Sequence, residues 1–330
     1  MAQAAFVHFG LGKCASTFLQ GVWSIDPRYT AVNLGQAATA ARRLATAGQT
    51  ENLPRFELGV KPKAGTTMVA SSEGFSWDYL RRPALQGRIP DLHRISAFVM
   101  GQSGLSQTAL FMVRNPVDWV RAAHEQLVKE GDSLSGPDFV SVYRALIEHV
   151  LDLRFIADTF GAQFRKLVFL SADELREDPD AFWSRYAKAL KVPKPERASI
   201  EAVERDAHVS NRSLKDRLHH LAALNRQFNT VAGAWDALEG LPEAVQKERA
   251  GFRPQYDAST GWATRRLAEF AEDETLARLS GLAATDPDFV RLPLDEALRQ
   301  HLLTRFCDVL DEAGTMAPET VTGYRAALAG

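Results

Sequence analysis

The chain has 330 residues, of which 45% are hydrophobic and 24% are charged, so it can bury a globular core and is not a disordered protein. Its formal net charge of −2 gives no general attraction to nucleic acid or anionic membrane, so we expect neither as a partner, and any anion site must be local. The two cysteines, Cys14 and Cys307, are too few for a disulfide framework or a metal cluster.

The sequence carries no targeting or membrane signal. Its first residues lack the basic and long apolar regions of a signal peptide. It also has no run of roughly 18 apolar residues that would predict a transmembrane helix. We therefore expect a cytoplasmic protein.

The first predicted elements are those of an α/β unit. A short apolar strand at residues 4–8 is followed by a glycine-containing turn at residues 9–12 and by a helix that begins near Ser16. A second buried strand is predicted at residues 66–70, and a helix at residues 89–101.

A further strand, at residues 109–113, precedes a helix with clear start signals. Asn115 is a favourable N-cap, Pro116 suits the first helical position, and Asp118 complements the positive helix start. These signals predict a helix over residues 116–129.

The remaining predicted elements complete the sheet and then become helical. A long amphipathic helix is expected at residues 138–160 and a buried strand at 166–170. A capping box at residues 171–174 opens a short helix, and Asp178-Pro179 opens another that runs to about residue 190. Residues 192–211 are expected to be mostly loop, and the last predicted helices cover residues 214–228, 235–248, 262–270 and 294–310.

These elements predict the fold class. Strands that alternate with helices form a mostly parallel sheet with helices on both faces, so we expect a doubly wound α/β fold. Residues 1–191 would form this core, and residues 192–330 would be a helical part packed on it within a single structural domain.

Residues 8–17 (His-Phe-Gly-Leu-Gly-Lys-Cys-Ala-Ser-Thr) form the predicted turn from the first strand into the first helix. Backbone N–H groups and the positive helix start favour an anion there, and Lys13 adds a full charge. Ser16 and Thr17 add hydroxyl donors. The segment is similar to a P-loop but does not match its pattern, since Cys14 replaces the Ser or Thr and Val7 replaces the first Gly.

A second anion site is expected after the strand at residues 109–113. A P-loop NTPase needs an acidic strand end that helps to hold magnesium, whereas this strand is followed by Arg114-Asn115. An arginine suits a second phosphate group. The two sites together predict a metal-independent transfer reaction with a nucleotide that carries anions at two separate ends.

Four segments resemble PAPS-dependent sulfotransferases, which use 3′-phosphoadenosine 5′-phosphosulfate as the donor. Residues 8–17 resemble the family's 5′-phosphosulfate loop, and residues 113–118 resemble its Arg-[Asp/Asn]-Pro motif for the 3′-phosphate. Residues 69–73 and 211–214 are similar to the Ser-Ser-Glu and Asn-x-Ser-Leu elements of bacterial members. The resemblance implies a P-loop-like nucleotide-binding fold, PAPS as co-substrate, PAP as product and no metal.

The chain departs from the family pattern at three positions. Gly12 replaces the usual proline, and Ala15 replaces the following glycine. Ala122 replaces a serine that commonly contacts the 3′-phosphate. The loss of one charge-assisted hydrogen bond costs about 1.5–3 kcal/mol, so Arg114 would have to share this phosphate with groups that the sequence does not identify.

The resemblance also implies residue roles. Lys13 would neutralise or protonate the bridging oxygen as PAP departs, and Glu73 would be the general base that deprotonates the acceptor, with His8 as the competing base. The remaining donor-binding residues are Gly12, Cys14, Ala15, Ser16, Thr17, Arg114 and Asn211. The structural alternatives are a solvated Lys13 and Glu73, a packed His8, and an Arg114 that forms a salt bridge at the sheet edge.

The acceptor cannot be identified from the sequence beyond its hydroxyl group. A carbohydrate, a glycolipid or another small-molecule alcohol all fit. Two alternative functions stay open, namely a PAP-binding or PAPS-binding module without catalysis and a small-molecule kinase. The sequence does not determine the oligomeric state.

Overall fold

The computed structural model describes residues 4–51, 53, 63–75, 79–80, 82–210, 214, 217–239, 242–284 and 286–330. The chain forms two compact units. The first comprises Met1–Trp119, Tyr143–Ala207 and Leu294–Gly330, and the second comprises Val120–Val142 and His208–Pro293. The last segment of the chain therefore belongs to the same unit as the strands.

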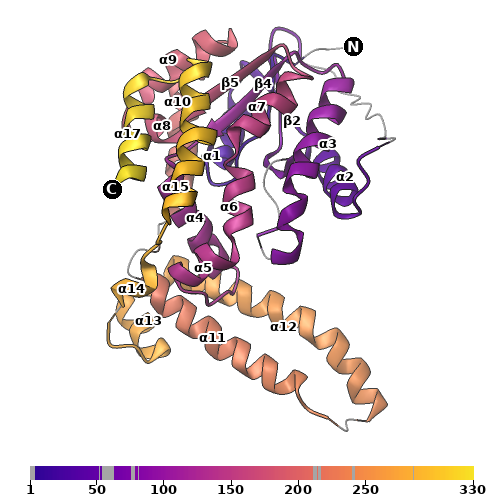
Figure 1. Cartoon of the computed structure of the whole chain (residues 1–330), viewed down its shortest axis with the longest axis vertical. Coiled ribbons are helices and arrows are strands. Elements are labelled where there is room, and N and C mark those ends of the chain that lie inside the picture. The colour runs from indigo at the N-terminus through magenta and orange to yellow at the C-terminus, as the bar shows by residue number, and fades with distance from the viewer. Residues whose placement is uncertain are drawn as a thin grey trace. The chain divides into compact units, whose positions relative to one another are not determined.

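The first unit contains a five-stranded sheet in which every neighbouring pair is parallel, in the order β2-β3-β1-β4-β5 (Figure 1). This confirms the predicted α/β class with a parallel sheet. The order places β1 at the centre, between β3 and β4. The strands are β1 (Phe6–His8), β2 (Tyr29–Asn33), β3 (Thr67–Ser71), β4 (Thr108–Val113) and β5 (Lys166–Ser171).

Helices connect the strands and make up most of the rest of the chain. The α-helices of the first unit are α1 (Ser16–Ile25), α2 (Gly35–Thr46), α3 (Ile89–Gln102), α6 (Arg144–Val150), α7 (Leu153–Gly161), α8 (Ala172–Glu177), α9 (Pro179–Leu190), α15 (Glu296–Leu302), α16 (Asp308–Ala313) and α17 (Pro318–Ala329). Helix α10 (Arg197–Ser210) also lies in this unit except for its last three residues. Those of the second unit are α5 (Gly136–Val142), α11 (Arg217–Asp236), α12 (Glu243–Phe270), α13 (Asp273–Ser280) and α14 (Pro287–Val290), and α4 (Pro116–Lys129) begins in the first unit and ends in the second. Shorter helical turns are η1 (Glu73–Phe75), η2 (Pro83–Arg88) and the π-helical η3 (Leu303–Cys307).

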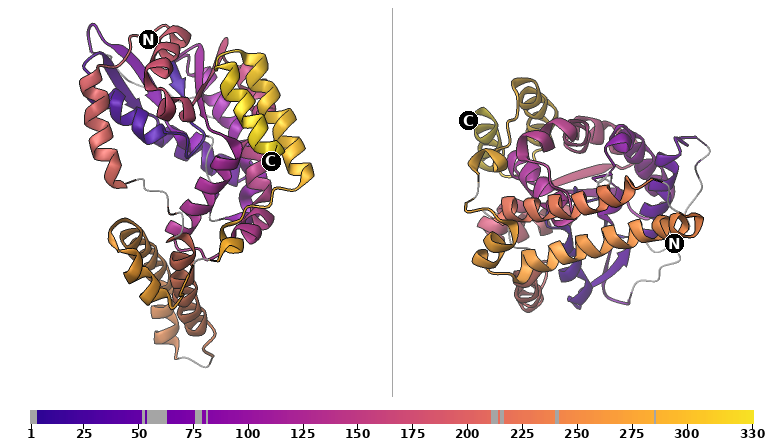
Figure 2. Two further views of the ribbon diagram at one scale, coloured as in Figure 1. Left: turned by 90° about the vertical axis from the view of Figure 1, so that its left-hand side faces the viewer. Right: turned by 90° about the horizontal axis from the view of Figure 1, so that it is seen from below.

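Aromatic side chains pack on both faces of the sheet. On one face, Phe6 of β1 packs against Trp23 of α1 and Tyr186 of α9, and Trp23 Nε1 donates a 3.0 Å hydrogen bond to the Tyr186 hydroxyl. On the other face, Phe111 of β4 contacts Phe160 of α7 with ring centres 4.9 Å apart. Helices therefore cover both faces, which is compatible with the predicted doubly wound arrangement (Figure 2).

The free edge of β5 is covered by the C-terminal segment. The backbone N–H of Phe169 donates to Thr315 Oγ1 at 3.1 Å, and the Thr315 hydroxyl donates to the Phe169 carbonyl at 2.8 Å. An edge strand presents unpaired backbone groups, so this contact explains why residues 294–330 belong to the unit that contains the sheet.

Several predictions of secondary structure were wrong. The helix expected at residues 235–248 does not form as one element, since α11 ends at Asp236 and α12 begins at Glu243. Residues 138–160 form three helices, because the chain leaves the helical path near Tyr143 and again at Leu151-Asp152, where the Asp152 carboxylate caps α7 by accepting from the Phe155 N–H. Residues 192–211 were expected to be loop, but α10 covers Arg197–Ser210. Val203 of α10 lies against Gly21 of α1, so packing stabilises a helix with a mostly polar sequence.

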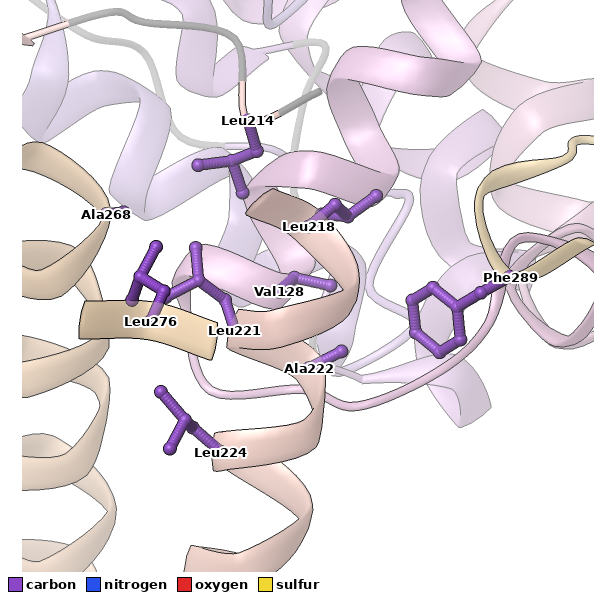
Figure 3. Close-up of a cluster of buried hydrophobic side chains, with 9 residues drawn as sticks. All are labelled: Val128, Leu214, Leu218, Leu221, Ala222, Leu224, Ala268, Leu276 and Phe289. Atoms are coloured by element: carbon purple, nitrogen blue, oxygen red, sulfur yellow. The ribbon is translucent and has the colours of Figure 1, made fainter. Parts of the chain in front are cut away.

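The second unit has its own core, around the paired helices α11 and α12. Leucine side chains of α11 meet Val128 of α4, Leu276 of α13 and Phe289 of α14 (Figure 3). Asn225 joins the same packing through polar groups, since its Nδ2 donates to the Val128 carbonyl at 2.8 Å and its Oδ1 accepts from the Thr264 hydroxyl at 2.6 Å. None of the helices in the described part of the chain is long and apolar enough to cross a membrane.

The core of the second unit makes a direct stability prediction. Leu221→Ala removes a fully buried side chain from α11 and should lower the free energy of unfolding by about 2–5 kcal/mol. Val231→Ala on the same helix is the matched control, because Val231 is 61% exposed and its truncation should cost less than about 0.5 kcal/mol. Urea unfolding followed by circular dichroism measures both, and equal losses would contradict the packing described here.

Candidate functional site

The turn that follows β1 lies at the centre of the sheet's carboxyl edge. The Phe9 N–H donates to the Leu110 carbonyl at 3.0 Å and so keeps the start of the turn paired with β4. Lys13 and Ala15 adopt left-handed backbone conformations, with φ of 69° and 63°. Ala15 is the N-cap of α1, where its side chain makes no capping bond, so the first N–H groups of α1 are available to an anion.

Trp119 stabilises this turn through a hydrogen bond. Its indole Nε1 donates a 2.8 Å hydrogen bond to the Gly12 carbonyl, and its side chain is fully buried. Cys14 is also fully buried, and its thiol donates to the Gly12 carbonyl at 3.7 Å, so the thiol is not available to a ligand. Thr17 is exposed and Lys13 is partly exposed.

Two polar side-chain atoms are buried beside the turn without a hydrogen-bond partner among the described residues. They are Ser16 Oγ and His8 Nε2. A Cβ added to Gly10 would lie 2.4 Å from Ser16 Oγ and 3.0 Å from His8 Nε2, so both atoms lie against Gly10 and leave no room for a side chain there. Gly10 also has a φ of +27°, and a side chain there would be strained as well as obstructive.

His8 contacts two side chains, Ser71 and Trp23. Its Nδ1 lies 2.8 Å from Ser71 Oγ, which accepts a 2.9 Å bond from Gln20 Nε2, and its ring packs edge-on against Trp23. Burial lowers the pKa of His8 to about 3, so the imidazole is neutral at physiological pH. His8 is therefore a packed, hydrogen-bonded residue, which was the alternative that we gave to its role as a base.

Three charged side chains that follow β3, β4 and β5 act on the turn, namely Glu73, Arg114 and Asp173. Burial raises the pKa of the Cys14 thiol well above its usual value, Arg114 opposes this shift, and Asp173 and Glu73 add to it. All three charges therefore act at the position of Cys14. Glu73 begins η1, directly beyond β3, and its side chain is partly exposed.

Asp173 fixes the ends of β4 and β5 to each other. Its buried Oδ2 accepts from the Asn115 N–H at 2.6 Å and from the Tyr324 hydroxyl at 2.9 Å. Its Oδ1 lies 3.9 Å from Arg114 Nε, a long ion pair that leaves the guanidinium 25% exposed at the sheet edge. The salt bridge considered as the alternative role for Arg114 is therefore present, but only at this long distance.

The structure brings most of the predicted site residues to one edge of the sheet. The loop from Gly12 to Thr17, His8, Glu73 and Arg114 all belong to the carboxyl ends of the adjacent strands β3, β1 and β4. Asn211 lies outside the described residues, so its contact with the donor stays a prediction. Within the described ranges, no group of three or more His, Cys, Asp or Glu side chains is placed to hold a metal ion.

Sequence reasoning did not identify several residues that build this edge. Asp173 appeared only as part of a capping box, although Ser171 does cap α8 as predicted, accepting from the N–H groups of Asp173 and Glu174. Tyr324 is far away in sequence, and no local pattern connects it with Asp173. No family model matches the sequence, and no curated protein matches it significantly.

The pKa of His8 makes a prediction about stability and pH. In the folded state the His8 imidazole stays neutral down to about pH 3, whereas in the unfolded state it takes up a proton below about pH 6.5. Acid therefore favours unfolding between pH 6.5 and about 3. Within this window His8 should reduce the free energy of unfolding by up to about 1.4 kcal/mol per pH unit. The variant His8→Gln has no imidazole at this position, so its free energy of unfolding should not carry this dependence on pH.

Urea unfolding of both proteins at several pH values measures the difference. The stability of the wild type should fall more steeply with acid than that of His8→Gln. Equal slopes would mean that His8 is not buried as a neutral group. His124, His149 and His219, whose pKa values burial also lowers, contribute equally to both proteins.

Proposed function

We propose that this protein is a sulfotransferase, which moves a sulfuryl group from PAPS to an acceptor hydroxyl and releases PAP, on a doubly wound fold of the P-loop type. The observation that supports the proposal is the position of the two segments to which we assign the anions. The turn that contains Lys13 follows β1, Arg114 follows β4, and these strands are parallel neighbours paired at Val7–Ala109 and His8–Leu110. Both sites therefore open at the same edge of the sheet.

The 5′-phosphosulfate group is assigned to the turn after β1. The uncapped N–H groups at the start of α1, the charge of Lys13 and the hydroxyl of Ser16 suit a compact anion. The 3′-phosphate is assigned to Arg114, whose guanidinium offers paired N–H donors to phosphate oxygens. Asp173 orients this arginine through the long ion pair.

In the transfer step, the acceptor oxygen attacks the sulfur as the bond from sulfur to the bridging oxygen breaks. PAP departs with the bonding electrons, and Lys13 stabilises the negative charge that develops on the bridging oxygen. Glu73 takes the proton of the attacking hydroxyl. The acceptor is a carbohydrate, a glycolipid or another small alcohol.

Glu73 suits the role of base better than His8 does. Glu73 is partly exposed at the sheet edge, where an acceptor can reach it. One ring nitrogen of His8, Nδ1, is already engaged by Ser71. A buried imidazole with a pKa of about 3 is also a poor proton acceptor near neutral pH.

Nucleotide selectivity tests the assignment of the donor. PAP should raise the melting temperature of the protein, and magnesium-ATP should not, because Arg114 provides a site for a 3′-phosphate. Arg114→Ala should weaken PAP binding by about 10- to 150-fold through the loss of charge-assisted hydrogen bonds.

Arg176→Ala is the matched control for this experiment. Arg176 also pairs with Asp173, at 3.3 Å, but it is 59% exposed on α8 and has no assigned phosphate contact. Its substitution should leave PAP affinity within about twofold of the wild type. Stabilisation by magnesium-ATP but not by PAP would favour a small-molecule kinase instead.

Turnover tests the two catalytic roles. Lys13→Ala should reduce sulfate transfer by a factor on the order of 100 or more, and Glu73→Gln should reduce it by a similar factor while PAP affinity stays nearly unchanged. Glu177→Gln, at a carboxylate that is 70% exposed, is the control and should retain full activity.

The assay for these variants is transfer of label from sulfur-labelled PAPS to alcohols in a cell extract, which also identifies the acceptor. Full activity of Glu73→Gln would exclude Glu73 as the base. PAP binding without transfer to any acceptor in a broad screen would favour a binding module that lacks catalysis, an alternative that Ala122 keeps open.

A further inference from the structure

Two buried hydrogen-bonding atoms beside Gly10 are not satisfied by any of the described residues. His8 is fully buried and Ser16 is 2% exposed, and neither His8 Nε2 nor Ser16 Oγ has a partner among the described residues. A buried polar atom left unpaired is unfavourable, so such a pair in one place indicates a ligand that completes it. The pair lies at the start of α1, where an anion is also favoured by the helix.

The hydrogen bonds around His8 indicate which ring nitrogen carries the proton. Gln20 Nε2 donates to Ser71 Oγ at 2.9 Å, so the Ser71 hydroxyl uses a lone pair there and its own proton needs an acceptor. Among the described residues, His8 Nδ1, 2.8 Å away, is placed to accept it. A neutral imidazole has one donor and one acceptor nitrogen, so this arrangement favours the tautomer with the proton on Nε2.

The orientation of this ring is fixed. His8 and Ser71 are direct partners in the register of β1 and β3, so their side chains point to the same face of the sheet. Trp23 packs edge-on against the imidazole with ring centres 5.4 Å apart. Nε2 is thus held beside Gly10 before any ligand arrives, and this preorganisation favours binding.

We propose that His8 binds the donor directly, as an Nε2–H donor that shares one oxygen-rich group of the 5′-phosphosulfate with the Ser16 hydroxyl. The inference rests on the proposed function, and it gives His8 a role different from that of a base. The ligand class is a tetrahedral phosphoryl or sulfuryl oxyanion, whose oxygens only accept hydrogen bonds and therefore match two donors. Burial keeps the imidazole neutral, so the bond does not depend on a charged histidine.

Nuclear magnetic resonance of the full chain, with histidine labelled by nitrogen-15, tests the tautomer and the contact. Two-bond proton–nitrogen correlations of the free protein should place the His8 proton on Nε2. Ser71→Ala removes the group that holds Nδ1 as an acceptor, and it should produce a mixture of tautomers. A free protein with the His8 proton on Nδ1 would overturn the inference.

Binding measurements test the donor itself. His8→Leu has no N–H group but retains the buried volume, so it should fold and should bind PAP about 10- to 100-fold more weakly. His8→Gln keeps an N–H group near the position of Nε2 and should bind within about threefold of the wild type. Urea unfolding of both variants separates a loss of binding from a loss of folding.

Two probes, PAP and inorganic pyrophosphate, separate this inference from the proposed function. A shift of the His8 Nε2 signal with PAP, together with weaker binding by His8→Leu, supports both. PAP binding that leaves the His8 signal and the His8→Leu affinity unchanged overturns the role of His8 alone. If pyrophosphate shifts the signal but PAP does not bind, the oxyanion role stands and the sulfotransferase proposal fails. If neither probe binds, both are overturned.

Discussion

The parallel pairing of β1 with β3 on one side and with β4 on the other is the constraint on which the candidate site depends. Parallel strands place their carboxyl ends at the same edge of a sheet, and this edge is where ligands bind in open α/β folds. The glycine-containing turn, Glu73 and Arg114 each follow one of these strands. The register of three short strands therefore brings together groups that lie far apart in sequence, such as Lys13 and Arg114.

The same edge contains features that are unfavourable for stability alone. Lys13 and Ala15 adopt left-handed conformations without being glycine, and His8 Nε2 and Ser16 Oγ are buried without partners in the described part of the chain. Each such feature costs on the order of 1 kcal/mol or more. Buried aromatic side chains around this turn, among them Trp23 and Trp119, supply the packing that holds it in place. Binding of an oxyanion, as proposed above, would provide hydrogen-bond partners for both of these atoms.

Local signals in the sequence were sufficient to predict elements with strong boundaries, and insufficient elsewhere. Asn115 and Pro116 define the start of α4, which the structure has at Pro116–Lys129 as predicted. β2 was missed because only part of its side chains are buried, so it has no continuous apolar run. The apolar spacing of residues 138–160 continues across two breaks, and the polar α10 is stabilised by packing against α1. For the site, the turn and Arg114 could be recognised from local motifs, but the contacts of Asp173 with Tyr324 and of His8 with Ser71 depend on pairing across the sheet.

A crystal structure of the protein with bound PAP is the most direct test of the central claim. The account predicts a 5′-phosphate within hydrogen-bond distance of the N–H groups at the start of α1 and a 3′-phosphate against the guanidinium of Arg114, with the nucleotide lying across the ends of β1 and β4. A nucleotide bound elsewhere, or one whose two phosphates reach only one of these sites, would contradict it.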